Sequence, residues 1–257
     1  MSPAAAMSLE ELMRRARLWR AGEAAAEPGL PTGFDALDAA LPGGGWPFPG
    51  LIEILSAQPG SGGLRLLLPV LARLSRESRW LIWVAPPYQP YAPALQTAGL
   101  ALNRVMLVDL ASETQGAEGA VRPAAAAGAE VLWAFEQALR FPGCGAALLW
   151  PQEIDALRLR RLQLACEAGG TLGVLFRPAE CAAQASPAAL RLLLRPQPAC
   201  AALDVIFLKC RGSPRARECR LPLEEAPMRA GFGVRSDEAV ERAIPRERPA
   251  GFPPPRE

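Results

Sequence analysis

Composition limits the side-chain chemistry that this chain can perform. It contains no histidine, which excludes a Ser-His-Asp or Cys-His nucleophile, a histidine general base and a histidine-ligated metal. No two of its six cysteines are closer than nine positions, so none has the spacing of a zinc or redox motif. We therefore expect no metal site. The cysteines are Cys144, Cys166, Cys181, Cys200, Cys210 and Cys219.

The residues best suited to bind a ligand form a glycine-rich turn at positions 58–63, with the sequence QPGSGG. An apolar run at 51–55 predicts a strand before the turn, and an apolar segment with arginines at 64–76 predicts a helix after it. Such a turn directs backbone N–H groups at the helix N-terminus, where they can bind a phosphate. The sequence thus indicates either a phosphate loop or a glycine-rich turn that resembles one without binding phosphate.

Strands and helices alternate along the chain beyond this turn. The predicted strands lie at residues 80–85, 105–110, 146–150 and 172–176, and the predicted helices at 91–98, 130–140 and 153–168. The alternation is typical of crossover units, and short, continuously apolar strands are typical of a sheet covered on both faces. We therefore predict an α/β fold with a mostly parallel central sheet flanked by helices.

The pattern changes after Pro178. Apolar runs at 190–194 and 202–208 predict two strands with no helix between them, which indicates an antiparallel extension at the C-terminal edge of the sheet. From residue 213 onward the chain is rich in Arg, Pro and Glu, and we predict a loosely ordered tail over 222–257.

A helix is predicted at residues 8–26, with Leu12 and Trp19 in its apolar stripe. It either packs on its own domain or docks onto a partner. The predicted parts of the chain are an N-terminal helix (1–28), a core (29–212) and an Arg/Pro-rich tail (213–257). Because no apolar stretch reaches about 20 residues, we expect a cytoplasmic protein that does not cross a membrane.

Several segments resemble the entry to a RecA-type ATPase core. They are residues 31–38 (PTGFDALD), 42–47 (PGGGWP) and 50–54 (GLIEI). A wider set is similar to the ImuA family of RecA/SulA-like proteins; it comprises residues 41–47, 58–62, 85–95, 136–140, 160–165 and 176–178. The resemblance covers residues 30–212 and implies a RecA-like fold. Members of this family are encoded beside a Y-family-like polymerase homologue and an error-prone DnaE-type polymerase in bacterial damage-response cassettes.

The resemblance places other residues where a RecA-type ATPase carries its catalytic groups. A working phosphate loop reads G-x-x-x-x-G-K-[ST], in which the Lys neutralises phosphate oxygens and the Ser or Thr holds Mg²⁺. Here Gly63 stands at the Lys position and Leu64 at the Ser/Thr position. Trp150 stands at the position of the metal-holding Asp, and the catalytic Glu falls near Pro86. Because phosphoryl transfer depends on such electrostatic positioning, we expect no ATP hydrolysis and no cofactor.

The glycine-rich turn is then best interpreted as a degenerate phosphate loop, retained because the strand-to-helix turn needs glycine. Residual binding of a nucleotide or an anion is the alternative. The residues concerned are Gln58, Gly60, Ser61, Gly62 and Gly63.

DNA binding is an open alternative. The net charge of +2 creates no global field that would attract nucleic acid. The resemblance assigns single-stranded DNA contacts to residues 150–158 and 178–190, but both segments are short and contain acidic residues, unlike the basic, aromatic groove that such binding needs. A basic cluster near the last strand is either a solvated edge or a contact for nucleic acid or an acidic partner. It consists of Lys209, Arg211, Arg215, Arg217 and Arg220.

Two further groups of residues have a structural and a functional interpretation. Arg158, Arg160 and Arg161 form a second basic cluster on a predicted helix, which faces either solvent or a partner. Four tryptophans lie in or beside predicted core elements, so we expect them to be buried rather than to form a binding site. They are Trp80, Trp83, Trp133 and Trp150.

The resemblance predicts a non-catalytic, RecA-like adaptor that supports SOS-type, damage-induced mutagenic translesion synthesis. It implies contact with RecA, with the Y-family-like (ImuB-like) polymerase homologue, or with both, and indirectly with the DnaE-type polymerase. Leu12, Trp19 and the tail from Arg215 onward are the expected contact elements. Two alternatives stay open. One is a SulA-like cell-division inhibitor that binds the tubulin-like division protein; the other is a nucleotide-binding recombination ATPase, which Gly63 and Leu64 count against.

Overall fold

The structure, a computed structural model, describes residues 28–58, 60–109, 128–151, 153–197, 202–212 and 216–222. The predicted N-terminal helix with Leu12 and Trp19 lies outside these residues, and so do Arg215 and the segment after Pro222. The chain divides into two units, Met1–Pro227 and Met228–Glu257. All of the described residues belong to the first unit.

One sheet of eight strands forms the centre of the described chain, in the order β3-β2-β4-β5-β1-β6-β7-β8. Its strands are β1 (Gly50–Ser56), β2 (Trp80–Val84), β3 (Val105–Val108), β4 (Cys144–Leu149), β5 (Leu172–Pro178), β6 (Leu190–Gln197), β7 (Ala202–Cys210) and β8 (Glu218–Pro222). Every pairing from β3 to β6 is parallel, whereas β6–β7 and β7–β8 are antiparallel. The predicted α/β class, with a mostly parallel sheet and an antiparallel C-terminal edge, is confirmed.

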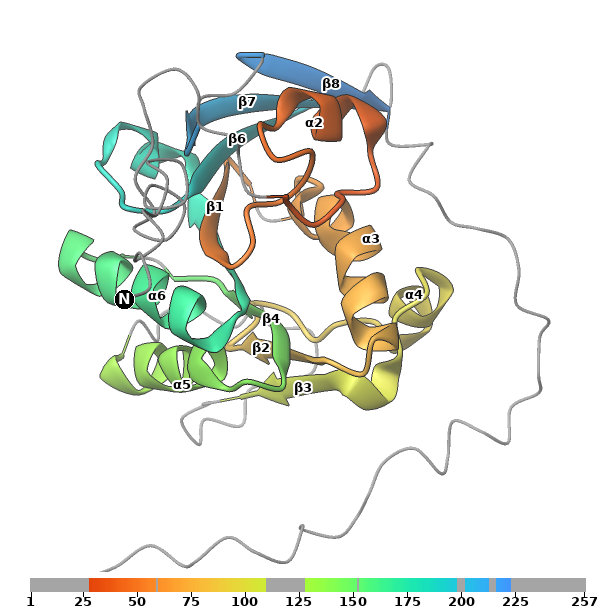
Figure 1. The fold of residues 1–257 in the computed structure, drawn as a ribbon, viewed down its shortest axis with the longest axis vertical. Helices are drawn as coiled ribbons and strands as arrows, with labels where there is room; N and C mark the ends of the chain where they lie inside the picture. The colour runs from red at the N-terminus through yellow and green to blue at the C-terminus, as the bar shows by residue number, and fades with distance from the viewer. Residues whose placement is uncertain are drawn as a thin grey trace, which may run out of the picture. The chain divides into compact units, whose positions relative to one another are not determined.

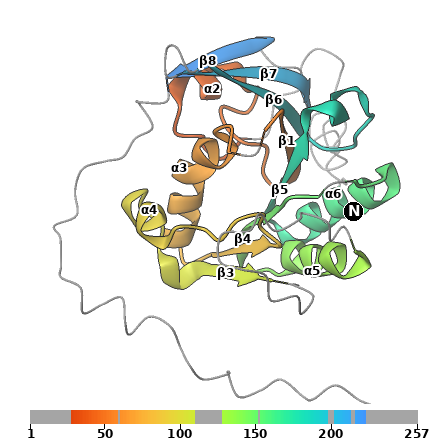
Figure 2. The same cartoon turned by 180° about the vertical axis from the view of Figure 1, so that it is seen from behind.

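Helices cover both faces of this sheet (Figures 1 and 2). α3 (Gly63–Arg76) packs on one face, and α5 (Ala129–Arg140) and α6 (Ala156–Gly169) pack on the other. The shorter elements are α2 (Asp35–Ala40), α4 (Ala92–Thr97), η1 (Leu102–Arg104) and η2 (Ala179–Ala183). Each face has its own apolar core, with Trp46 and Trp83 buried on the α3 side and Phe135 buried on the α5–α6 side. None of the helices in the described ranges is long and apolar enough to cross a membrane.

The C-terminal part of the core differs most from the prediction. β6 pairs with β1 in parallel, so the strand predicted as half of an antiparallel extension also continues the parallel part of the sheet. β8 lies inside the segment predicted as tail and buries Leu221, which is 1% exposed. The folded core therefore extends past residue 212 to Pro222. A five-residue strand that contains Glu, Arg and Pro has little apolar periodicity, which explains why the sequence pattern did not indicate it.

Two helix boundaries have local causes that the sequence pattern did not resolve. α2 was not predicted; its preceding turn is held by the backbone N–H of Thr32, which donates to Asp38 Oδ1 at 2.8 Å. α6 begins at Ala156 rather than at Glu153, because the Asp155 carboxylate accepts a hydrogen bond from the backbone N–H of Arg158 at 2.7 Å. Asp155 is therefore the N-cap that starts the helix.

A buried carboxylate joins three neighbouring strands. Glu53, on β1, has a fully buried side chain whose carboxylate lies 2.7 Å from Arg191 Nε on β6 and 3.4 Å from Arg177 Nη1 on β5. The hydroxyl of Ser186 donates a further hydrogen bond to it at 2.6 Å. Buried charges persist only when they are paired and hydrogen-bonded, and Glu53 meets both conditions.

The two arginines also fix the segment between β5 and β6. Arg191 donates to the backbone carbonyls of Cys181 at 2.8 Å and Gln184 at 2.7 Å, and Arg177 Nη2 donates to the Gln184 side chain at 2.8 Å. Two guanidinium groups around one carboxylate leave a surplus positive charge, which these oxygen dipoles offset. The Glu53 network thus ties β1, β5 and β6 to η2.

Replacing Glu53 with Gln should strongly destabilise the protein. The change would leave Arg177 and Arg191 buried without a counter-charge, which costs about 3–5 kcal/mol in comparable buried pairs. Urea unfolding followed by tryptophan fluorescence measures the loss. The control is Glu77→Gln, which breaks the exposed Arg73–Glu77 pair (2.8 Å) and should cost less than about 1 kcal/mol. Equal losses in the two variants would contradict a structural role for the Glu53 network.

Candidate functional site

The glycine-rich turn lies at the carboxyl end of β1, directly before α3. Both Ser56 and Ser61 donate side-chain hydrogen bonds to the carbonyl of Gln58, at 3.0 Å and 2.5 Å. Gly62 is the N-cap of α3 and has a φ of +87°, a left-handed conformation that favours glycine. The turn therefore has hydrogen bonds of its own and a backbone requirement for glycine at this position.

Gly63, which the resemblance aligns with the phosphate-binding lysine, lies where a side chain would be crowded. A Cβ atom at Gly63 would lie 3.0 Å from Cε1 of Phe176 and 3.2 Å from Cγ2 of Ile54. Leu64, the next residue, packs against the apolar core, and Arg65 is exposed. The glycine here thus allows α3 to approach the ends of β1 and β5 closely.

Aromatic side chains fill the neighbouring carboxyl ends of the parallel strands. The β4–β5 register pairs Leu149 with Leu175, so Trp150 follows β4 beside Phe176 of β5. Their rings are stacked, with centroids 4.7 Å apart and planes 10° apart. Trp83 of β2 lies on the other side, with its centroid 6.2 Å from that of Trp150. The position assigned to a metal-holding carboxylate therefore belongs to an apolar aromatic cluster.

The segment assigned to the second DNA contact is held against the sheet. Cys181 and Ala188 are buried within it, and the backbone N–H of Ala189 donates to the carbonyl of Leu51 on β1 at 2.9 Å. Lys209 Nζ donates to the carbonyl of Ser186 at 2.6 Å. The segment 179–189 is thus anchored to the core at Cys181, Ala188 and Ala189 and by the Glu53 network, while Glu180 and residues 183–185 are exposed.

The structure places Arg220 of the basic cluster apart from Lys209 and Arg211. Lys209 and Arg211 lie at the end of β7, and Arg211 pairs with Glu167 at 3.5 Å. Burial lowers the pKa of Lys209, and the nearby charges of Arg191 and Arg211 act in the same direction.

Arg220 lies farther along the strand pair formed by β7 and β8. Arg220, on β8, makes a two-point contact with Asp204 at 2.6 Å and 3.2 Å, and this contact lowers the Asp204 pKa. Asp204, on β7, is paired in register with Arg220. Asp204 and Lys209 are five residues apart on β7, which corresponds to about 17 Å along the strand. Arg220 therefore lies apart from Lys209, whereas Arg217, whose backbone carbonyl accepts from the N–H of Phe207 at 2.9 Å, lies opposite a position only two residues from Lys209.

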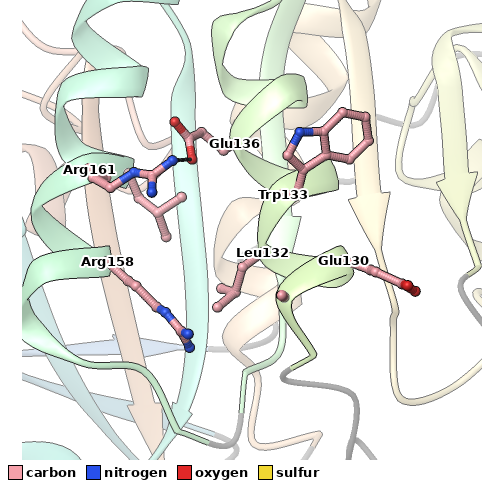
Figure 3. Close-up of a pocket in the computed structure, with 8 residues that line it drawn as sticks. Glu130, Leu132, Trp133, Glu136, Arg158 and Arg161 are labelled. Carbon is pink, nitrogen blue, oxygen red and sulfur yellow. Dashed lines mark hydrogen bonds and ion pairs between the residues drawn. The ribbon is translucent and has the colours of Figure 1, made fainter.

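A surface hollow that sequence reasoning missed lies between α5 and α6. It has a volume of ≈ 440 Å³. Its lining residues are Ala129, Glu130, Leu132, Trp133, Glu136, Arg158, Arg161 and Leu162. Figure 3 shows Arg158 and Arg161 extending from α6 toward α5, where Arg161 meets Glu136 at 2.7 Å, while Trp133 points away from α6. Trp133 is 65% exposed, so the expectation that it belongs to the core is wrong.

The cysteines of the described residues are free thiols, and burial makes several of them unreactive. Burial raises the pKa of Cys144 to about 12 and that of both Cys210 and Cys219 to about 11, and it also raises the pKa of Cys166. Since the thiolate is the nucleophile, none of these four residues is suited to covalent catalysis.

Replacing Trp150 with Ala should destabilise the core. The substitution removes the stack on Phe176 and should cost about 3 kcal/mol, as other large truncations of packed aromatic residues do. Trp133→Ala is the matched control, because its exposed indole should contribute within about 0.5 kcal/mol. Urea unfolding curves monitored by circular dichroism compare the variants. A similar small loss in both would mean that the aromatic cluster is not part of the packed core.

Native thiol reactivity should be low at neutral pH. A thiol whose pKa is about 11 instead of 9.0 carries about a hundredfold less thiolate. In a Cys181→Ser/Cys200→Ser background, the remaining four cysteines should react with a disulfide reagent far more slowly in the folded protein than in urea. The folded-state rate should rise with pH toward 11. Rapid native labelling at pH 7 would contradict the burial of these thiols.

Comparisons with known proteins identify relatives of this sequence. The family model described as cell division inhibitor SulA matches residues 52–173. Cell division inhibitor SulA of Edwardsiella piscicida is 31% identical over 115 residues, which cover 45% of this chain and 60% of the relative. Protein ImuA of Caulobacter vibrioides is 30% identical over 161 residues, which cover 61% of this chain and 60% of the relative.

A solved structure, the crystal structure of SulA from Pseudomonas aeruginosa, matches 49% of this chain and 97% of that chain at 25% identity, with a TM-score of 0.37. The chain spans about 60% of the length of the curated relatives that it matches. By sequence, therefore, this chain is similar to ImuA over 61% of its length and to SulA over 45%.

Proposed function

We propose that this chain is a non-catalytic, RecA-like adaptor in an SOS-type DNA-damage response, where it supports mutagenic translesion synthesis. The similarity to ImuA supports this assignment, because it extends over 61% of the chain whereas that to SulA of Edwardsiella piscicida extends over 45%. The ImuA resemblance implies binding to RecA, to a Y-family-like polymerase homologue, or to both. A DnaE-type polymerase would be reached indirectly through such contacts.

The observation that carries the non-catalytic part of the proposal is the packing around Gly63. The space that a phosphate-binding lysine would need is limited by Phe176 and Ile54, and Phe176 is itself stacked on Trp150. Restoring a lysine would require these core side chains to move. This crowding counts against the recombination ATPase and supports a proposal in which the protein acts through its surface.

A cell-division inhibitor is the second candidate function. The SulA family model spans residues 52–173, which include β1 to β4 and α3 to α6. Such an inhibitor also needs a binding surface rather than a nucleotide. The two functions differ in their partners, since the inhibitor would bind the tubulin-like division protein and the adaptor would bind RecA or the polymerase homologue.

Capture of the tagged protein from DNA-damaged cells tests the proposal. We expect RecA or the polymerase homologue to be recovered, and deletion of residues 223–257, which leaves β8 and its buried Leu221 in place, to abolish polymerase binding while the core stays folded. Loss of the gene should lower damage-induced mutation frequency. The control is purified protein assayed with Mg-ATP and single-stranded DNA, which should release no phosphate.

Three results would contradict parts of this assignment. Recovery of the division protein without RecA or the polymerase, together with filamentous growth on overexpression, would establish the inhibitor instead. DNA-dependent phosphate release would establish the ATPase. Unchanged polymerase binding after the deletion would exclude the tail as the contact element.

A further inference from the structure

α6 presents apolar side chains to solvent on the side opposite its core contacts. Leu157 is 72% exposed and Leu164 is 52% exposed, although the same helix buries Leu159 and Leu162 against the sheet. Seven residues span nearly two helical turns, so Leu157 and Leu164 lie within about 20° of each other around the helix axis. They form a short apolar ridge that no described residue covers.

Arginines flank this ridge on both sides. At 3.6 residues per turn, Arg160 falls on one side of the ridge and Arg158 and Arg161 fall on the other. The side chains of Arg158 and Arg161 are 50% and 62% exposed. We call these five residues the α6 face: Leu157, Arg158, Arg160, Arg161 and Leu164.

The α6 face carries a surplus of positive charge. Within α6, the three arginines are accompanied by one carboxylate, Glu167, which pairs with Arg211 at 3.5 Å. Outside α6, Asp155 lies 3.4 Å from Arg158 but also caps the helix.

The carboxylate on α5 is shared as well. Glu136 lies between Arg161 at 2.7 Å and Arg140 at 3.1 Å, so two guanidinium groups compete for one acid. Glu130, at the rim of the hollow, is the other acid on α5. Among the described residues, the guanidinium groups of the α6 face therefore have more donors than these carboxylates engage.

The hollow beside the ridge gives the face a concave side. Leu132 and Leu162 line it with apolar surface, at 7% and 2% exposure, and Arg158 extends toward Leu132 from α6 (Figure 3). A partner side chain that entered the hollow would meet leucine beneath it and a guanidinium group at its edge. The shape and charge thus match a single amphipathic element rather than a flat surface.

We infer that the α6 face is a docking site for an acidic amphipathic helix of a partner protein. The helix would place apolar side chains, spaced three or four residues apart, against Leu157, Leu164 and the hollow. Its flanking Asp or Glu residues would pair with Arg158 and Arg160. This is helix recognition by apolar anchors, with charge complementarity fixing orientation and selecting the partner.

The α6 face fits a protein better than a nucleic acid or a lipid surface. Single-stranded nucleic acid stacks its bases on aromatic side chains in a basic groove. The apolar side chains of the α6 face are leucines, which offer no aromatic ring for such stacking. A helix that lies on a membrane buries a whole apolar face, whereas the main apolar face of α6 is already occupied by the sheet.

Peptide binding to the full-length protein tests this inference directly. The probes are two fluorescent helical peptides with identical leucine spacing, one flanked by Glu and the other by Lys. We expect the Glu peptide to bind the wild type. It should bind about tenfold or more weakly to Arg158→Glu/Arg160→Glu and to Leu157→Asp/Leu164→Asp, as expected when central anchors are lost. The Lys peptide should gain affinity for the charge-reversed variant.

Control variants introduce the same kinds of substitution at exposed positions away from the α6 face. Arg73→Glu reverses an arginine that is 49% exposed on α3, and Tyr91→Asp replaces an aromatic residue that is 72% exposed. Neither should alter peptide binding. Because all substituted side chains are exposed, circular dichroism should show an unchanged fold in each variant.

The inference rests on the proposed adaptor function, because it requires a protein partner. Partner capture from DNA-damaged cells is therefore repeated with the same variants. Recovery of RecA or the polymerase homologue by the wild type, reduced about tenfold by both α6-face variants, supports the site. Equal recovery by all variants, together with equal peptide binding, overturns it. If the wild type captures neither protein, the proposed function fails, while the peptide measurements still decide the site.

Two other results would also overturn the inference. One is a dimer of the wild type in sedimentation that the α6-face variants convert to a monomer, because the face would then bind a second copy. The other is binding to phosphatidylglycerol vesicles that only these variants lose, because the face would then contact lipid.

Discussion

The buried carboxylate of Glu53 is the constraint on which the middle of this fold depends. It is paired with Arg191 at 2.7 Å and with Arg177 at 3.4 Å, so a single side chain links the strand before the glycine turn to both of its neighbours. Arg191 continues the network into the backbone of residues 181–184. A lone buried acid would be neutralised or excluded, so the burial of Glu53 depends on the contacts that it makes with the neighbouring strands. The register of β1, β5 and β6 and the position of the β5–β6 connection are thus coupled.

This coupling determines what the carboxyl edge of the sheet can do. In open α/β sheets, ligands bind at the carboxyl ends of the strands because the turns there leave a crevice. Here Phe176 and Trp150 stack in that region, and Phe176 closely approaches Gly63. The space beside the glycine turn is occupied by aromatic carbon. At the carboxyl edge of the sheet, where other open α/β sheets bind ligands, this fold has packed aromatic side chains.

The sequence indicated the alternating elements well because they are apolar runs of the right length, bounded by Gly and Pro. It also indicated Gly63 and Leu64 as departures from a working loop, which depends only on residue type. It did not indicate β8, because the burial of Leu221 depends on pairing with β7. Glu53 lay unnoticed in a run interpreted as a strand, since its two arginines are 124 and 138 residues away. Trp133 and the hollow were missed for a similar reason: helix periodicity shows which residues share a face, but not which neighbouring element leaves that face open.

The same reasoning explains why surface contacts are the place to seek function here. Core side chains on both faces of the sheet are closely packed, and the titratable groups within the core, Glu53, Arg177 and Arg191, are engaged with one another. α6 differs because it has leucines on two sides: Leu159 and Leu162 pack inward while Leu157 and Leu164 face solvent. An exposed leucine alone needs no explanation, but two at helical spacing, flanked by arginines and next to an apolar hollow, form a surface with shape and charge. A rigid core that holds such a helix fixes the spacing between its anchors, which is what recognition of another helix requires.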